Sequence, residues 1–409
     1  MKADVKTEAL LAPLIRGAIM EKTRCPWVVS FVPGGEGGGA GELSLDLEAE
    51  DEKTGAEKIT AAFWESAFFK ENKIPLRIRV NCNGAAYYYL SAPYREGIEK
   101  IRRGEQKDPW ELEGKLDSAR SSVVSGKIDY GLSRAEVVKN RIALVTGGAQ
   151  GFGEEITRGL VSAGALVFIA DLNRAGAEKL AAALNEEYGK MTAIPVEVNV
   201  GDEASVEAMA ETMALSCGGV DLCVSNAGVL RASAILEQDI PSFRLVTDVN
   251  YVAFAIVTKH CGRLMRAQHA ASPSWMGDII QINSKSGLEG SNKNGAYAGS
   301  KFGSIGLVQS FAKELVEYNI KVNALCPGNF FDGPLWADPE KGLFVQYLKT
   351  GKVPGAKTVE EVKAFYESKV PMGRGCTGPD VIRAILYLVE QIYETGQALP
   401  VTGGQVMLN

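Results

Sequence analysis

The chain has 409 residues, of which 46% are hydrophobic and 23% charged, and its formal net charge at pH 7 is -6. This composition predicts a folded protein with a large core, and the length favours two domains. The acidic balance and the lack of a Lys/Arg-rich run argue against a nucleic-acid partner. No apolar stretch approaches the ~20 residues that cross a bilayer, so we expect no membrane partner.

Cysteine and histidine are distributed in a way that argues against a metal site. The seven cysteines are scattered and form no C-x-x-C pair, which is typical of reduced thiols in a cytoplasmic protein. The two histidines, His260 and His269, fall where a helix is expected, as surface or core residues. With so few imidazoles we expect no bound metal.

Residues 1–135 predict a small α+β domain. The opening segment 1–22 has apolar residues interrupted by Glu8, Arg16 and Glu21, which predicts an amphipathic helix rather than a signal peptide. Further elements are expected in this order: strands at 27–32 and 43–47 around a glycine-rich turn at 34–41, a helix at 56–70, strands at 75–82 and 86–91, and a helix at 94–103. The charged, serine-rich stretch 104–139 predicts a docking helix and a linker.

Residues 136–409 predict a second domain of α/β class. Strand and helix patterns alternate at 142–146, 156–163, 166–170, 177–188, 193–198, 203–215 and 222–225. Such alternation implies right-handed βαβ units. The expected fold is therefore a doubly wound parallel sheet covered by helices on both faces.

A glycine-rich turn follows the first strand of this domain. Gly147, Gly151 and Gly153 lie between a buried strand and an amphipathic helix, which is the context of a dinucleotide-binding loop. Asp171 ends the next strand, where its carboxylate can bind the ribose hydroxyls and repel a 2′-phosphate. NAD is therefore favoured over NADP as the cofactor. Arg174 is a nearby cation that could bind the 2′-phosphate, so NADP stays an alternative. The other interpretation of the glycines is a tight turn that binds no nucleotide.

Four polar residues form a candidate catalytic set. Tyr297 and Lys301 lie four residues apart at the start of a helical pattern, Ser284 follows a buried strand, and Asn250 lies upstream. A phenol needs a nearby positive charge to act as a base near neutral pH, which Lys301 can supply. Ser284 can bind the substrate oxygen, and Asn250 can anchor a water. Alone, the pair of Tyr297 and Lys301 fits an ordinary helix start better.

Taken together, these motifs resemble the short-chain dehydrogenase/reductase family over about residues 140–409. The resemblance implies a seven-stranded Rossmann sheet with NAD at its carboxyl edge, and a homo-oligomer, a tetramer or a dimer. The chain departs from the family at Asn199-Val200, where Asp-Val is usual. The resemblance implies cofactor contacts at Gly147, Gln150, Gly151, Phe152, Gly153, Asp171, Leu172, Asn199, Val200, Asn226, Ala227, Gly228, Tyr297, Lys301, Pro327, Gly328 and Asn329.

A narrower resemblance is to members of this family that act on hexitol phosphates. It is carried by the runs 279–287, 290–291, 301–303, 306–307, 309–310, 317–318, 328–329, 369–371, 374–376 and 401–407. It implies oxidation of sorbitol 6-phosphate to fructose 6-phosphate, with Ser284, Lys285 and Tyr297 at the substrate. Lys285 either holds the phosphate or is a solvated loop residue. Arg374 and Arg231 are weaker phosphate candidates.

Other functions stay open from the sequence. The substrate can be another polyol, sugar or sugar phosphate. An NAD-sensing regulatory protein is the alternative of another class, although a sensor has no need of the whole catalytic set. Residues 1–135 match no family that we recognise, and a fused zinc-dependent aldolase is excluded because the first 259 residues contain no histidine. We expect a structural or assembly role there, with a regulatory ligand site as the alternative.

Overall fold

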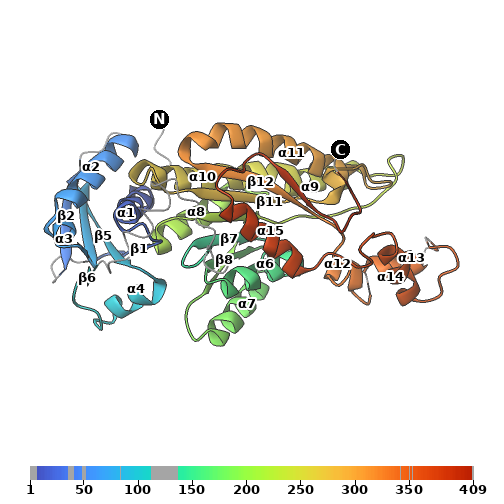
Figure 1. Ribbon diagram of the computed structural model, residues 1–409, viewed down its shortest axis with the longest axis horizontal. Helices are drawn as coiled ribbons and strands as arrows, with labels where there is room; N and C mark the ends of the chain where they lie inside the picture. The colour runs from blue at the N-terminus through green and yellow to red at the C-terminus, as the bar shows by residue number, and fades with distance from the viewer. Residues whose placement is uncertain are drawn as a thin grey trace.

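The computed structural model describes residues 7–35, 41–47, 52–82, 84–111, 137–340, 342–349, 351 and 353–407. The boundary expected near residue 135 and most of the expected linker lie outside the described residues, as does most of the glycine-rich turn at 34–41. The N-terminal elements, in blue, lie at one end of the molecule, and helices α12 to α14 lie at the other (Figure 1).

The N-terminal region is α+β, as the sequence predicts. A four-stranded sheet has the order β1-β5-β4-β2, in which β2 runs parallel to β4 and the other pairs are antiparallel. Strand β4 alternates buried and half-buried residues, so one of its faces packs on the helices. The elements are α1 (Thr7–Thr23), β1 (Val28–Phe31), β2 (Glu42–Leu47), α2 (Glu52–Glu65), α3 (Ala67–Lys70), β3 (Lys73–Ile74), β4 (Arg77–Cys82), β5 (Ala85–Ala92), α4 (Arg95–Arg102) and β6 (Trp110–Glu111).

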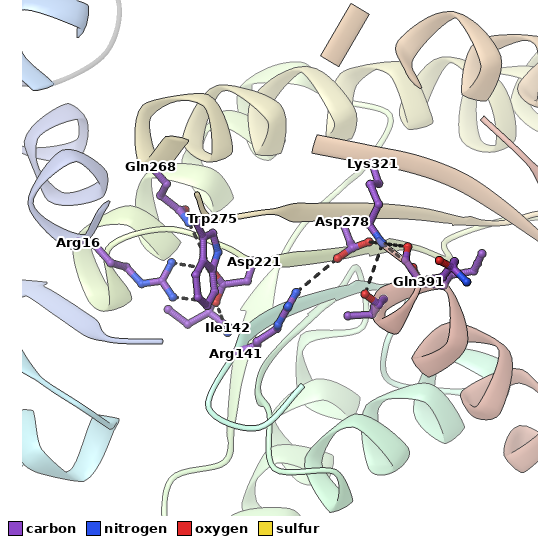
Figure 2. A network of polar contacts seen from close by, with 11 residues as sticks. Arg16, Arg141, Ile142, Asp221, Gln268, Trp275, Asp278, Lys321 and Gln391 are labelled. Atoms are coloured by element: carbon purple, nitrogen blue, oxygen red, sulfur yellow. Dashed lines mark hydrogen bonds and ion pairs between the residues drawn. The ribbon is translucent and has the colours of Figure 1, made fainter. Parts of the chain in front are cut away.

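Helix α1 is not amphipathic, and that expectation is wrong. Every residue from Leu11 to Met20 is buried, including Arg16. The helix is buried because tertiary contacts cover it on all sides. It packs against α2 and β1 of its own region and against α8 and α10 of the second region. Its Arg16 reaches Asp221 at the amino end of the large sheet (Figure 2). The N-terminal region is thus attached at the sheet end opposite to the expected cofactor site.

The second region is a seven-stranded parallel sheet, which confirms the predicted doubly wound fold. Its order is β13-β12-β11-β10-β7-β8-β9. The elements that build the sheet and its layers are β7 (Ile142–Thr146), α6 (Gly151–Ser162), β8 (Leu166–Asp171), α7 (Arg174–Glu187), β9 (Ala193–Glu197), α8 (Glu203–Cys217), β10 (Leu222–Ser225), α10 (Ala253–Ala271), β11 (Gly277–Ile282), α11 (Gly295–Leu315), β12 (Ile320–Pro327), α15 (Gly378–Glu390) and β13 (Ala398–Val401).

The two faces of this sheet have separate cores because neighbouring residues of a strand point to opposite faces. Leu144 and Phe168 pack with Met213 and Phe254, beneath α8, α10 and α11. On the other face, Val145 packs among residues of α6, α7 and α15. Both faces are therefore covered, which fits the nearly continuous apolar runs of the strands.

A smaller aromatic lobe follows strand β12. It consists of α12 (Pro334–Ala337), α13 (Leu343–Lys349) and α14 (Val359–Glu367). Phe331, Trp336 and Phe344 form its core, with ring centroids 5.0 to 5.7 Å apart. The lobe lies beyond the carboxyl end of the sheet (Figure 1), where ligands of open α/β sheets bind.

One helical run in the described part of the chain, Ile240–Ala271, is long and apolar enough to cross a membrane by length and composition. It comprises α9 (Ile240–Thr247), the π-helical turn η2 (Asp248–Val252) and α10. Helix α10 packs against strands β10, β11 and β12. Because sheet-covering helices pass the same test, this run is weak evidence for a membrane.

Candidate active site

The glycine-rich loop requires glycine for two physical reasons. Gly147 and Gly151 have φ angles of +62° and +57°, which L side chains rarely adopt. A Cβ atom on Gly153 would lie only 1.8 Å from the carbonyl oxygen of Gly147. Helix α6 starts at Gly151, after Gln150 at its N-cap. The loop is therefore compact, and the start of α6 offers N–H groups to an anion such as a pyrophosphate.

The loop that follows β10, which begins with Asn226 and is called the second loop below, is hydrogen-bonded to the glycine-rich loop. The Thr146 hydroxyl accepts hydrogen bonds from the backbone N–H groups of Asn226 (3.0 Å) and Ala227 (3.1 Å). The Asn226 amide donates to the carbonyl oxygens of Thr146 (3.0 Å) and Gly147 (3.1 Å). These bonds fix the ends of strands β7 and β10 side by side at the carboxyl edge of the sheet.

Asp171 lies at the end of β8, beside the glycine-rich loop. Its carboxylate is buried and accepts hydrogen bonds from the N–H groups of Ala149 (3.0 Å) and Asn173 (2.9 Å). The next residue, Leu172, is 70% exposed. Arg174 is the cation because of which NADP stayed an alternative cofactor. It forms ion pairs with two glutamates, Glu178 (2.8 Å) and Glu197 (3.6 Å).

The Asn199-Val200 pair follows strand β9. The Asn199 side-chain oxygen accepts a hydrogen bond from the N–H of Gly201 at 3.1 Å, and Val200 is buried. Strands β8 and β9 are parallel neighbours. The turn that holds Asn199 therefore lies at the same edge of the sheet as Asp171.

The Pro327-Gly328-Asn329 segment ends strand β12. The Gly328 N–H donates to the carbonyl of Val401 at 2.9 Å, and the carbonyl of Asn329 accepts from the N–H of Cys376 at 2.8 Å. The next residue, Phe330, stacks on Phe152 in the first turn of α6, with ring centroids 4.4 Å apart and planes 12° apart. The sequence analysis missed Phe330, and the only signal was an aromatic residue directly after the Pro-Gly-Asn segment.

Three candidate catalytic residues meet where β11 ends and α11 begins. Ser284 caps the short 3-10 turn η3 (Lys285–Gly287), and Tyr297 and Lys301 lie in the first turns of α11. The buried Lys301 ammonium donates to the carbonyl of Ile282 at 2.9 Å. It lies 5.7 Å from the centroid of the Tyr297 ring.

Asn250 joins this group through the second loop. Its side chain accepts from the N–H of Val229 at 2.8 Å and donates to the Val229 carbonyl at 2.9 Å. A Cβ atom on Gly228 would lie 3.2 Å from Asn250 Oδ1 and 3.8 Å from Lys301 Nζ. Asn250 lies in the π-helical turn η2, and such turns are frequent at functional sites. In this arrangement it positions the loop, while the water-anchoring role stays a prediction.

Burial sets the acid–base properties of the site. It raises the pKa of Tyr297, while hydrogen bonding to Ser284 acts in the opposite direction. It lowers the pKa of Lys301 to about 8. Burial also raises the pKa of Cys326 to about 12, against the positive charge of Lys301. All seven cysteines are free and six are buried. The sequence analysis did not place Cys326 near Lys301.

The three candidates for binding a phosphate differ in their surroundings. Lys285 is partly buried directly after Ser284, and burial lowers its pKa. The guanidinium of Arg374 makes two hydrogen bonds to Asp380, of 2.7 and 3.0 Å. Arg231 is exposed and donates to the carbonyl of the residue before it. Lys285 is therefore the candidate next to Ser284, and Arg374 is engaged in an internal ion pair.

Comparisons with known proteins agree with this geometry. The model of the short chain dehydrogenase family matches residues 141–337. Sorbitol-6-phosphate 2-dehydrogenase of Escherichia coli (strain K12) is 36% identical over 271 residues, which are 66% of this chain and 99% of the relative. The 3-oxoacyl-[acyl-carrier-protein] reductase FabG of Aquifex aeolicus (strain VF5) is 30% identical over 269 residues, 65% of this chain and 98% of FabG.

The fold is also similar to that of a solved dehydrogenase structure. The crystal structure of sorbitol-6-phosphate 2-dehydrogenase SrlD from Erwinia amylovora is similar with a TM-score of 0.60 at 40% identity, covering 65% of this chain and 100% of SrlD. The relatives differ in the substrates that their names state, so the comparisons support the reaction type more strongly than the substrate.

Proposed function

Because the chain belongs to the short-chain dehydrogenase/reductase family, we propose that it oxidises sorbitol 6-phosphate to fructose 6-phosphate with NAD. The observation that carries this proposal is the cluster of Ser284, Tyr297 and Lys301 at the carboxyl edge of the sheet, with the partly buried Lys285 next to Ser284. The cluster supplies the base for alcohol oxidation, and Lys285 supplies a positive charge for a phosphate.

Each catalytic residue has a separate task in this proposal. The Ser284 hydroxyl holds the substrate oxygen, and Tyr297 removes the hydroxyl proton. Since burial raises the pKa of Tyr297, its phenolate form depends on the hydrogen bond to Ser284 and on the ammonium of Lys301. Bound NAD would accept the hydride released from the carbinol carbon.

The residues at the candidate binding site of the adenosine ribose favour NAD over NADP. The Asp171 carboxylate is fixed by two backbone N–H groups and would repel a 2′-phosphate. Arg174, which could otherwise attract that phosphate, is paired with two glutamates. Because Gly153 has no side chain, the start of α6 packs closely against the Gly147 carbonyl, as the third glycine of a dinucleotide-binding loop allows.

A second candidate is the dehydrogenation of an uncharged polyol or sugar. The observation that favours it is Glu289, whose negative charge acts on Lys285 and can offset its attraction for a phosphate.

We also propose that the protein is a cytoplasmic homo-oligomer, a tetramer or a dimer, as the family resemblance implies. Light scattering of the purified protein tests the assembly.

A substrate panel separates the two candidates. Polyols and their phosphates are each mixed with NAD or NADP, and formation of the reduced cofactor is followed by absorbance. The proposal expects the highest kcat/KM for sorbitol 6-phosphate with NAD. A preference for free sorbitol, or no reaction with any hexitol phosphate, would replace the proposed substrate with the second candidate.

A further inference from the structure

A second lysine lies at the same end of the sheet as Lys285. The segment that follows Lys369 packs on the turn after β13: the Met372 N–H donates to the Gly403 carbonyl at 3.1 Å, and a Cβ atom on Gly403 would lie 2.9 Å from Val370. Strand β13 adjoins β12, and β12 adjoins β11, which leads into Ser284. The segment that contains Lys369 therefore lies at the same end of the sheet as the candidate catalytic residues.

The position of Lys369 is fixed by its neighbours. Its ammonium lies 4.0 Å from the centroid of the Phe365 ring and 5.4 Å from that of Tyr366, both at the end of α14. Such contacts restrain a cation over an aromatic face. The next residue, Val370, is buried, while the Lys369 side chain is exposed. The ammonium is thus held at the surface of the aromatic lobe and stays accessible.

The pKa of Lys285 responds to the charges around it, including that of Lys369. Burial lowers the pKa of Lys285, the negative charge of Glu289 raises it, and the positive charge of Lys369 lowers it further. Two ammonium groups that repel each other destabilise their charged forms unless an anion lies nearby. An anion bound by both lysines would therefore relieve this repulsion.

Ion pairing within the described part of the chain distinguishes these two lysines from other cations. Within the described ranges, no ion pair involves Lys285 or Lys369. The buried Lys321, by contrast, pairs with Asp278 at 2.9 Å. Internal pairing therefore leaves both ammonium groups available, whereas it occupies Arg374 through Asp380.

From this juxtaposition we propose that Lys285 and Lys369 together bind the phosphate group of the substrate. The inference rests on the proposed function and deepens it, because it adds a specificity-determining residue from the end of the aromatic lobe. A phosphate monoester carries a charge of about -1.5 to -2 near neutral pH, which two ammonium groups match. Lysine binds phosphate as a point charge, so no bidentate geometry is needed.

Inorganic phosphate is the probe, titrated by calorimetry into the full-length protein loaded with NAD. The variants are Lys285→Met and Lys369→Met, and the matched control is Lys349→Met, an exposed lysine of the same lobe. Each of the first two variants should weaken phosphate binding by about tenfold to a hundredfold, as expected for a charge-assisted contact. The control should bind like the unmodified protein, and equal melting temperatures verify that all variants fold.

The outcomes distinguish the site from the substrate. If Lys369→Met binds phosphate as tightly as the control does, the two-lysine site is wrong. If both lysine variants lose phosphate binding and also raise KM for sorbitol 6-phosphate but not for sorbitol, the result supports both the two-lysine phosphate site and the proposed substrate. If phosphate binding depends on both lysines although sorbitol 6-phosphate is not oxidised, the anion site stands and the proposed function falls.

Discussion

Arg16 of the N-terminal helix and Asp221 of the large sheet form a fully buried ion pair with two parallel hydrogen bonds, of 2.8 and 2.7 Å (Figure 2). Asp221 also accepts from the N–H of Ile142 at 2.8 Å and from the indole of Trp275 at 3.1 Å. Although burial acts to raise the pKa of Asp221, the charge and hydrogen bonds of Arg16 hold it below its ordinary value. The N-terminal region thus supplies the cation for a carboxylate inside the dehydrogenase sheet.

Replacing Arg16 should destabilise the whole protein. Arg16→Met leaves the Asp221 carboxylate buried without its main counter-charge, so we expect the free energy of unfolding at pH 7 to fall by about 3–5 kcal/mol. Urea denaturation of the full-length protein measures this difference. The double variant Arg16→Met with Asp221→Asn should regain part of the loss, because the uncompensated charge is removed. A loss below about 1 kcal/mol in the single variant would contradict the role of the pair.

The same pair predicts a pH dependence. Because the folded protein lowers the pKa of Asp221, its ionised form stabilises the fold above the ordinary carboxyl range, and this contribution is lost as the pH falls. Without Arg16, burial dominates and Asp221 takes up a proton more easily. The difference in unfolding free energy between the unmodified protein and Arg16→Met should therefore shrink between pH 7 and pH 4. A constant difference over that range would speak against the charge as its cause.

Tyr297→Phe should lower kcat by about a hundredfold or more and leave NAD affinity nearly unchanged, because only the proton-transfer group is removed. Steady-state kinetics and NAD titration of the same preparation provide the two measurements. Retention of most of the activity would exclude Tyr297 as the base.

Ser284→Ala should shift the pH profile of alcohol oxidation. Hydrogen bonding to Ser284 lowers the pKa of Tyr297 against the effect of burial, so its loss raises that pKa. A base must be deprotonated to act, and the rising limb of kcat/KM should therefore move to higher pH. A variant that loses rate equally at every pH would show that Ser284 acts only on the substrate.

Asp171→Ala should shift the ratio of kcat/KM values toward NADP, because the carboxylate that repels the 2′-phosphate is gone. Affinity for both cofactors should fall as well, since Asp171 also accepts hydrogen bonds from Ala149 and Asn173. The unmodified protein provides the reference, and equal use of NAD and NADP by it would refute the role given to Asp171.

The sequence alone was sufficient for the parallel sheet and for the position of the candidate site residues along it. Strand and helix periodicities are local, and the glycines around Gly151 are needed because of backbone conformation. Residues at the ends of parallel strands meet at one edge, so Ser284 and Tyr297 could be placed together with the glycine-rich loop from their order along the chain. Their roles stay predictions.

Only the tertiary structure decided which charges are paired and which sides of a helix are covered. Helix α1 was expected to have an exposed face, yet α8 and α10 bury it, and Arg16 meets an aspartate 205 residues away. In the same way, the structure pairs Arg374 with Asp380. Such contacts depend on how complete elements pack. Because burial and distance determine the strength of a charge interaction, no local pattern in the sequence could reveal them.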